Sequence, residues 1–277
     1  MTRKGKVGLA LGFGLMSACG LSYAEDIPHP RLPSPSAIGG QARYQIQATL
    51  DTVSKKITAS QKVFFTNATQ KPLNEVFFHI YPHRRYTPEE INFMARYAGY
   101  FKVDPFPDGF QSGRMEIQSL AQNGRSSNFF IEGEDQTLLK VSLLEALAPG
   151  KTAELMIDFT VDIPHAYGRV GWHEDIFALS RWYPILSVLD EGGWHNHPFY
   201  PFHRPFFSEA AYYSVALTVP ANQVVIHSGQ LKATQSHDNK TQTLTVETPL
   251  PIREFTLAMS PRYQVLEGDS KTVKIKS

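Results

Sequence analysis

The sequence predicts an all-β protein, built as an antiparallel β-sandwich with one short helix. Apolar and polar residues alternate with a period of two over many short runs, and these runs are rich in β-branched and aromatic residues. Turn-forming residues separate the runs. With 42% hydrophobic residues among 277, the chain has enough apolar surface to bury a substantial core. Many short strands at this spacing are typical of a sandwich.

The first 24 residues form a separate compositional unit, which we interpret as a signal peptide. Arg3, Lys4 and Lys6 give a cationic start, and residues 7–18 form an uncharged, mostly apolar run. This run is too short for a comfortable bilayer span. We therefore expect an exported protein that is periplasmic, secreted or lipid-anchored in the cell envelope.

Two routes of processing fit this segment, and the sequence leaves both open. Small residues precede Glu25, as a signal peptidase requires, while residues 16–19 approximate a lipobox that ends at Cys19, the only cysteine of the chain. An acylated Cys19 would tether the protein to a membrane, with the Pro-rich segment 25–41 as the linker. Without Cys19 the exported chain has no thiol, so packing rather than disulfides must stabilise it.

The β-sandwich domain is expected at residues 42–265, and residues 266–277 are expected to be the truncated start of a following region. Turn-forming pairs such as Asn123-Gly124 and Pro149-Gly150 separate the runs. The expected strands are residues 44–50, 62–66, 75–80, 115–120, 138–143, 153–161, 212–219, 223–227, 241–246 and 254–259.

Residues 88–97 predict the one helix. Thr87 can cap its N-terminus, and two glutamates in the first turn suit the positive end of the helix dipole. Two further segments, residues 105–113 and 192–207, are rich in Gly, Pro and aromatic residues and are expected to be long ordered loops. Loops of this length need function or tight packing to hold them.

Histidines are the first candidates for chemistry, and His195, His197 and His203 form the densest group. An H-x-H pair can bind a metal from a strand when a third ligand converges, which makes a metal hydrolase one hypothesis. Aromatic residues surround all three, so stacking of their rings within an aromatic loop is the stronger interpretation. We expect no metal site here.

A gluzincin zinc site needs H-E-x-x-H on a helix, because residues i and i+4 share a face and the Glu can act as general base. Only His79 and His83 have this spacing, and the proline between them would break a helix in a run that reads as a strand. His173-Glu174 begins the motif, but a phenylalanine holds the place of the second histidine. We therefore expect no catalytic residue and no cofactor in this chain.

The charge balance disfavours a nucleic-acid partner. Without residues 1–24, 24 basic and 26 acidic residues remain, a net charge of −2. Two pairs of adjacent carboxylates, Glu174-Asp175 and Asp190-Glu191, do not by themselves make a general acid/base pair, which needs convergence in space.

Several segments, taken in order, resemble the amino-terminal domain of aminopeptidase N-like gluzincins, a family of zinc metallopeptidases. The most informative begins with Arg181-Trp182-Tyr183-Pro184 and continues to Pro220. The resemblance covers about residues 42–265. It implies a saddle-shaped β-sandwich that packs on a thermolysin-like catalytic domain carrying the zinc. The other matching segments are residues 44–51, 63–67, 77–82, 147–151, 157–159 and 251–261.

The same resemblance implies a substrate site. In that family one acidic or amide residue of the amino-terminal domain helps to hold the free amine of the peptide, and counting back from Pro184 places this role at Glu174 or Asp175. A carboxylate suits it, because it can pair with a cationic terminus. The family's zinc ligands, general base and transition-state tyrosine have no counterpart here. The implied protein is a substrate-side domain, inactive alone, with a gluzincin catalytic domain and a peptide substrate as partners.

A function of another class stays open beside this one. The aromatic loop at residues 194–207 could grip a glycan or a peptide, because aromatic rings stack on sugars and anchor protein partners. The chain would then be a free-standing β-sandwich binding module.

Overall fold

The computed structural model describes residues 41–199, 207–269 and 274–276, all within one compact unit that spans residues 38–277. The expected signal peptide, Cys19, nearly all of the Pro-rich linker and His203 lie outside the described residues. None of the helices in the described part is long and apolar enough to cross a membrane.

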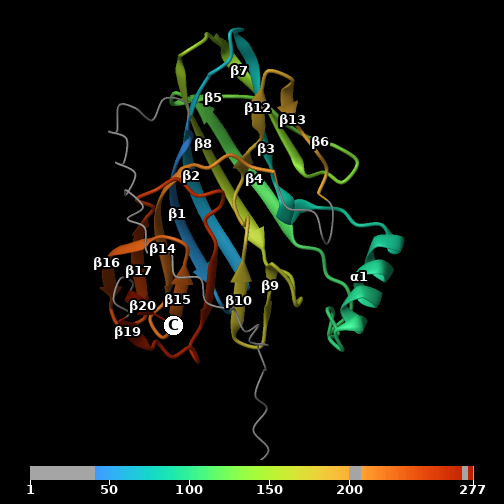
Figure 1. Cartoon of the computed structure of the whole chain (residues 1–277), viewed down its shortest axis with the longest axis vertical. Helices are drawn as coiled ribbons and strands as arrows, with labels where there is room; N and C mark the ends of the chain where they lie inside the picture. The colour runs from blue at the N-terminus through green and yellow to red at the C-terminus, as the bar shows by residue number, and fades with distance from the viewer. Residues whose placement is uncertain (1–40, 200–206, 270–273, 277) are drawn as a thin grey trace, which may run out of the picture. The chain divides into compact units, whose positions relative to one another are not determined.

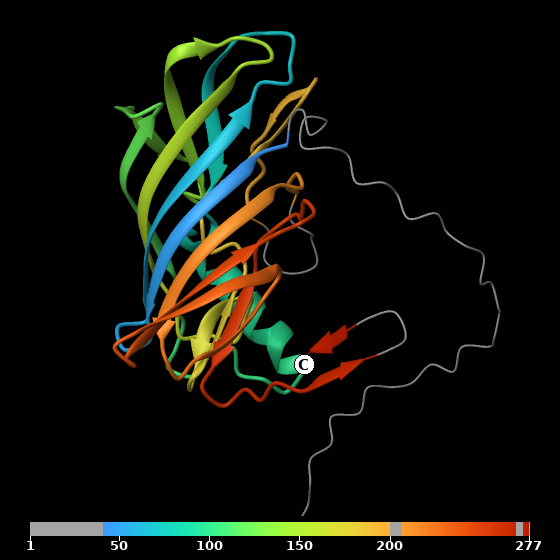
Figure 2. The ribbon, with the colours of Figure 1, turned by 90° about the vertical axis from the view of Figure 1, so that its left-hand side faces the viewer.

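The expected all-β sandwich is confirmed, and its largest sheet has eight strands in the order β16-β17-β14-β1-β2-β8-β4-β5 (Figure 1). Figure 2 shows the long strands of this sheet side by side. Its strands are β1 (Arg43–Asp51), β2 (Lys56–Thr66), β4 (Arg114–Gln122), β5 (Arg125–Ser126), β8 (Thr152–Asp162), β14 (Tyr212–Pro220), β16 (Gln230–His237) and β17 (Thr241–Glu247).

Two four-stranded sheets, β11-β3-β7-β6 and β15-β18-β10-β9, accompany the large sheet, together with the hairpins β12-β13 and β19-β20. The strands of the two smaller sheets are β3 (Leu73–His79), β6 (Phe129–Glu132), β7 (Leu138–Leu147), β9 (Val170–His173), β10 (Ile176–Leu179), β11 (Ile185–Leu186), β15 (Val224–His227) and β18 (Leu257–Ser260). The hairpins consist of β12 (Val188–Asp190) with β13 (Gly193–His195) and β19 (Glu267–Asp269) with β20 (Lys274–Lys276).

The alternation of the sequence places the core. Along β1, Tyr44, Ile46, Ala48 and Leu50 are buried while the residues between them are exposed. Buried residues of the large sheet and of both smaller sheets form one hydrophobic cluster. Each fully buried aliphatic or aromatic side chain contributes about 1.5–3 kcal/mol, so this shared cluster holds the layers together.

The sheet departs from the expected antiparallel pattern at one place, where β1 and β14 pair in parallel. Parallel neighbours need a long crossover, and all elements from β2 to β13 lie between these two strands in the chain. Other expectations need correction as well. β2 begins at Lys56 rather than at residue 62, β18 begins at Leu257 rather than at residue 254, and β13 occupies part of the expected loop 192–207. The strands that were not expected are β5, β6, β9, β10, β11, β12, β13, β16, β19 and β20.

The one helix is confirmed as α1 (Pro88–Tyr100), three residues longer than expected. Its N-terminus carries a capping box: the Thr87 hydroxyl accepts a hydrogen bond from the Glu90 backbone N–H at 3.3 Å, and the Glu90 carboxylate accepts one from the Thr87 N–H at 2.9 Å. The buried Arg84 pairs with Glu90 at 2.6 Å and approaches Asp135 at 3.8 Å. The start of α1 is thus fixed to the sandwich.

The block Arg181-Trp182-Tyr183-Pro184 lies in the core. Trp182 and Tyr183 are fully buried, and burial raises the pKa of Tyr183. The Tyr183 hydroxyl accepts a hydrogen bond from the Phe255 N–H at 2.8 Å, and Gln61 Nε2 donates to the Pro184 carbonyl at 2.9 Å. The most informative segment of the sequence therefore serves the fold.

Candidate functional site

The predicted substrate carboxylates lie in the turn of the β9-β10 hairpin. Glu174 has a left-handed backbone with φ of 52° and an exposed side chain, while Asp175 is half-buried. Arg262, which follows β18, donates to Glu174 Oε2 at 2.7 Å and to Asp175 Oδ1 at 2.8 Å from its Nε. The hydrogen bond from Arg262 lowers the pKa of Asp175. The two carboxylates thus already share one cation.

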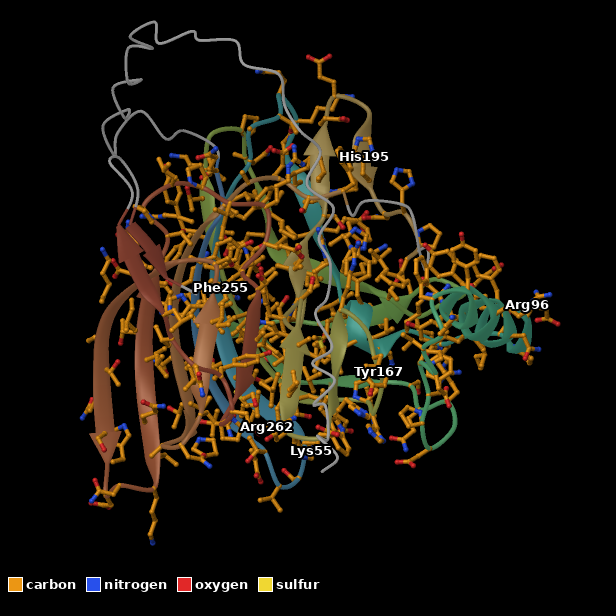
Figure 3. The ribbon with its side chains drawn as sticks, turned by 60° about the horizontal axis from the view of Figure 1, so that its bottom comes forward. Lys55, Arg96, Tyr167, His195, Phe255 and Arg262 are labelled. Carbon is orange, nitrogen blue, oxygen red and sulfur yellow. The ribbon has the colours of Figure 1, made fainter. Side chains whose placement is uncertain are left out.

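A chain of polar and aromatic side chains lies beside this hairpin. His165 Nδ1 is 2.7 Å from Asp108 Oδ2, and its Nε2 is 3.3 Å from His173 Nδ1. The ring of Trp172 stacks on His165, with centroids 4.2 Å apart. Lys55 Nζ lies over the Trp172 ring at 4.4 Å, and Figure 3 shows Lys55 toward the same end of the molecule as Tyr167 and Arg262.

Sequence reasoning missed this chain of side chains, because Asp108 and His165 are 57 residues apart and no local pattern joins them. In the hydrogen bond between His165 and His173, one imidazole must donate and the other must accept. Among the described residues, no group of three His, Cys, Asp or Glu side chains could hold a metal ion. The residues that the structure places therefore do not fit a zinc site.

The histidine group at residues 195–203 is only partly within the described residues. His195 lies in β13, and its Nε2 is 2.6 Å from Asp190 Oδ2, which closes the β12-β13 hairpin. This hydrogen bond lowers the pKa of Asp190. The ring of His197, which is exposed, has its centroid 5.6 Å from that of His195. His195 is thus engaged by Asp190 within its own hairpin.

Trp194 belongs to the sandwich rather than to an open loop. Its ring packs on Phe65 and Phe77, with centroids 5.7 Å apart in both cases. Phe199 instead lies with Tyr81, at 5.4 Å between centroids, and accepts a hydrogen bond from Arg84 Nε through its carbonyl at 3.2 Å. Trp194 and Phe199, both from the predicted aromatic loop, therefore pack against different parts of the protein.

A cavity of about 440 Å³, here called the α1 cavity, lies between α1, residues 105–113, residues 164–170 and Phe199. Its rings contact one another: Phe110 meets Tyr86 at 5.1 Å and Phe106 at 5.0 Å, both edge-on. Seven aromatic residues line it, namely Tyr81, Tyr86, Tyr97, Phe106, Phe110, Tyr167 and Phe199. Aromatic rings thus form much of the lining of this cavity.

Two arginines complete the wall of the α1 cavity. Arg181 is 4% exposed, its Nε is 2.9 Å from Glu254 Oε2, and burial lowers its pKa. Arg169 precedes β9 and is exposed. Burial also raises the pKa of Tyr81 to about 12, so its hydroxyl stays neutral at physiological pH. The cavity thus combines aromatic rings with two guanidinium groups, of which that of Arg181 is paired with Glu254.

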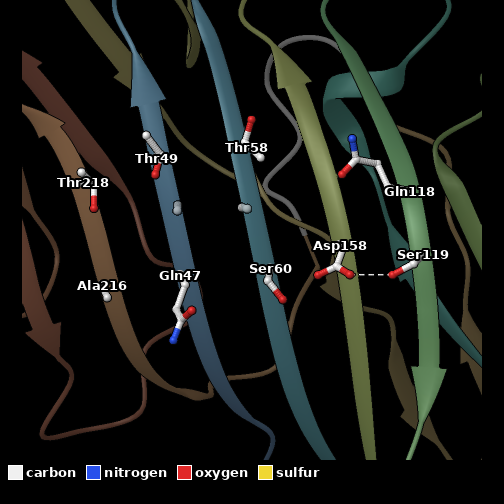
Figure 4. Close-up of a pocket in the computed structure, with 11 residues that line it drawn as sticks. Gln47, Thr49, Thr58, Ser60, Gln118, Ser119, Asp158, Ala216 and Thr218 are labelled. Atoms are coloured by element: carbon white, nitrogen blue, oxygen red, sulfur yellow. Dashed lines mark hydrogen bonds between the residues drawn. The ribbon is translucent and has the colours of Figure 1, made fainter. Parts of the chain in front are cut away.

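A second hollow, of about 560 Å³, lies on the outer face of the eight-stranded sheet (Figure 4). Short polar side chains line it, and Ser119 donates to Asp158 Oδ2 at 2.6 Å. Its lining residues include no aromatic ring and no cation. Ligand sites generally combine apolar surface with a few converging polar groups, so this hollow is the weaker candidate.

No family model and no curated protein matches the chain, but solved structures do. An M1 zinc metallopeptidase from Deinococcus radiodurans is 14% identical with a TM-score of 0.51, and the match covers 86% of this chain and 46% of that one. A mutant M1 zinc metallopeptidase from the same organism is 15% identical with a TM-score of 0.51, and that match covers 86% of this chain and 47% of the other. A mutant two-domain M1 zinc metallopeptidase bound to L-tryptophan is 15% identical with a TM-score of 0.51, and the match covers 86% of this chain and 46% of that one.

These identities are low, and the likeness therefore concerns the fold. This chain spans less than half the length of each of these structures. Zinc metallopeptidases are also the class that the sequence resemblance indicated. The chain thus shares its fold with part of the M1 zinc metallopeptidases.

Proposed function

We propose that the chain is the amino-terminal, substrate-side domain of an aminopeptidase-like zinc metallopeptidase, which needs a zinc-bearing catalytic domain for activity. The observation that carries this proposal is the fold likeness, which covers 86% of this chain and less than half of an M1 zinc metallopeptidase. The order of the sequence segments supports the same assignment. The zinc would belong to the partner domain, where it would activate water or polarise the peptide carbonyl.

Within this proposal, Glu174 and Asp175 hold the free amine of the peptide. A cationic terminus would join an ion pair that Arg262 already makes with both carboxylates. The exposed position of the hairpin allows this access. Arg262 would then orient the carboxylates, and the amine would bind to the lone pairs that Arg262 leaves unused.

The catalytic domain would dock at the end of the sandwich that carries this hairpin. Exposed apolar side chains accompany the carboxylates there: Tyr167 is 48% exposed, Ile176 37%, and Val53 in the β1-β2 turn 88%. We call Val53, Tyr167, Glu174, Asp175 and Ile176 the hairpin end. Docking on this surface would bury apolar groups and place the carboxylates beside the zinc-bearing cleft.

The test adds this chain to a purified zinc-bearing domain of an M1 metallopeptidase and follows hydrolysis of an aminoacyl coumarin amide. We expect activity only with both parts present. Asp175→Asn should raise KM about tenfold or more with a smaller change in kcat, because it weakens the grip on the amine. Glu116→Gln is the matched control, an exposed carboxylate of β4 that pairs with Arg114.

The proposal is abandoned if the two parts neither bind nor hydrolyse the substrate, or if Asp175→Asn leaves KM unchanged.

We also propose that residues 1–24 direct export and that Cys19 is a candidate lipid attachment site, as their sequence suggests. Cell fractionation with palmitate labelling, comparing the natural chain with Cys19→Ser, tests both routes. Label that depends on Cys19 supports the lipid anchor, whereas a mature protein that begins at Glu25 supports signal-peptidase cleavage.

A free-standing binding module is the second candidate function, because Phe199 from the predicted aromatic loop lines the α1 cavity. Trp194 does not favour it, since its partly buried ring packs against Phe65 and Phe77. Trp194→Ala would therefore lower the stability of the fold, which would obscure any effect on binding. Phe199→Ala is the better probe of this candidate.

A further inference from the structure

The α1 cavity combines features that ligand sites share. Its volume of about 440 Å³ falls within the usual range for small-molecule pockets, about 300–1,000 Å³. Six separate parts of the chain close around it, including α1 and the segment that carries Phe106 and Phe110. These parts are held in place by interactions outside the cavity, such as the contacts of Arg84 with Glu90 and with the Phe199 carbonyl.

The size and lining of the cavity indicate a flat apolar ligand. An apolar cavity of about 150 Å³ accepts one benzene molecule, so a cavity of about 440 Å³ has room for a two-ring compound with a polar group. Aromatic rings favour edge-on or offset contacts with further rings. The mutual edge-on arrangement of Tyr86, Phe106 and Phe110 leaves ring faces and edges for such contacts.

The charge of the cavity indicates an anionic group on that ligand. Glu254, which is not among the lining residues, compensates Arg181 from behind. Arg169 adds a second guanidinium at the exposed part of the lining, and none of the described lining residues is an Asp or Glu. A guanidinium presents a planar fork of donors that matches a carboxylate.

We propose that the α1 cavity is a binding site for a small aromatic carboxylate. Its rings lie among Tyr86, Phe106, Phe110 and Phe199, and its carboxylate faces Arg169. The site is separate from the carboxylates of Glu174 and Asp175 and does not depend on the proposed peptidase role. A chain without any catalytic partner would still bind this ligand.

Isothermal titration of the purified chain with 2-naphthoate tests the proposal, with 2-naphthalenemethanol as the uncharged analogue. We expect naphthoate to bind at micromolar to millimolar concentration and the alcohol about tenfold or more weakly. Arg169→Gln should reduce naphthoate affinity about tenfold and leave the alcohol unchanged. Because Arg169 is exposed, this variant should fold normally.

Two helix substitutions locate the ligand. Ala98 lines the cavity whereas Ala95, on the same helix, is exposed and does not, so Ala98→Phe should abolish naphthoate binding and Ala95→Phe should not. Circular dichroism checks that both variants keep the fold. The proposal fails if naphthoate does not bind at millimolar concentration, if Ala98→Phe binds it normally, or if Arg169→Gln weakens acid and alcohol equally.

Discussion

At the scale of single residues, His79 makes folding sensitive to pH. It lies at the end of β3, is 2% exposed, and burial lowers its pKa to about 4. The unfolded chain binds a proton near the ordinary value of about 6.5. The stability that comes from the neutral ring is therefore complete above about pH 6.5 and is lost as the pH falls toward 4, by about 3 kcal/mol in all.

Urea unfolding at about pH 7.5 and 4.5 measures this dependence, with His79→Gln as the variant that keeps a polar side chain but does not titrate. We expect the loss of unfolding free energy between the two pH values to be about 2.5 kcal/mol smaller in the variant. Other titrating groups, including His83, act in both proteins and cancel. Equal losses in both proteins would contradict the prediction.

Arg84 is the second residue with a large expected effect. It is 5% exposed and pairs with Glu90, and its guanidinium also lies over the Tyr86 ring at 4.3 Å. Arg84→Met keeps much of the packing but leaves Glu90 and Asp135 without their cation. We expect the free energy of unfolding to fall by about 2–4 kcal/mol, because a buried pair that loses one partner leaves an uncompensated charge.

Arg125→Met is the control for Arg84→Met, because Arg125 and Glu145 form an ion pair at 3.2 Å whose side chains are 68% and 80% exposed. Such a pair contributes at most about 1 kcal/mol. Chemical denaturation of both variants gives the comparison. If both variants lost a similar free energy of unfolding, the burial of Arg84 would not strengthen its contribution to stability.

The residues of the candidate site were only partly predictable. The sequence placed Glu174 and Asp175 through a family resemblance, but their partner Arg262 is 88 and 87 residues away and follows no local rule. The α1 cavity had a weak local signal, the aromatic residues of segment 105–113. Nothing in the sequence brings Arg169 or Phe199 to the same place, since only the packing of distant loops does so.

At the scale of elements, β9 depends on a glycine. A Cβ at Gly171 would lie 2.3 Å from the Ala166 carbonyl oxygen and 3.4 Å from that of Pro164. Backbone cannot move aside as a flexible side chain can. We therefore expect Gly171→Ala to displace β9 from residues 164–166 and to lower the free energy of unfolding by about 2–3 kcal/mol.

Gly150→Ala separates steric crowding from backbone strain, because no atom lies within 4 Å of a Cβ there but φ is +72°. This control should cost about 1–2 kcal/mol from the left-handed backbone alone. Hydrogen exchange identifies where each variant opens. Gly171→Ala should expose the amides of β9 and β10, and an effect spread evenly over the sandwich would contradict a local clash.

The accuracy of the strand predictions follows the length of each alternating run. β1, β8 and β14 are long and bury alternate residues over most of their length, and the sequence predicted nearly all of each; of β2 it predicted only residues 62–66. β9 and β10 have four residues each, too few to establish a period of two, and β16 is almost wholly exposed, so it has no buried face to reveal. Element length and one-sided burial thus set the limit of prediction.

At the scale of the whole molecule, the sequence predicted a sandwich but not the order of its strands. The parallel pair of β1 with β14 joins the start of the described fold to its last third, and hydrophobic alternation is the same in either direction of pairing. The core block at Trp182 and Tyr183 fills the space between the sheets. Under the proposed function, the partner of this chain is a zinc-bearing domain like the part of the M1 metallopeptidases that the match does not cover.

That partner should bind the hairpin end, and surface substitutions can test this without disturbing the core. Ile176→Asp places a charge on a side chain that is 37% exposed, next to Glu174 and Asp175. A charge in an apolar interface must be desolvated without a partner. We expect affinity for the zinc-bearing domain, measured by surface plasmon resonance, to fall about tenfold or more.

Phe130→Asp is the matched control, because Phe130 is 57% exposed in β6, which belongs to another sheet from β9 and β10. It should leave affinity unchanged, and both variants should keep the unfolding midpoint of the natural chain. The opposite result, with Phe130→Asp weakening binding and Ile176→Asp not, would move the docking surface to the β6 side. Glu174 and Asp175 would then lie away from the zinc-bearing cleft, and their proposed role at the substrate amine would be lost.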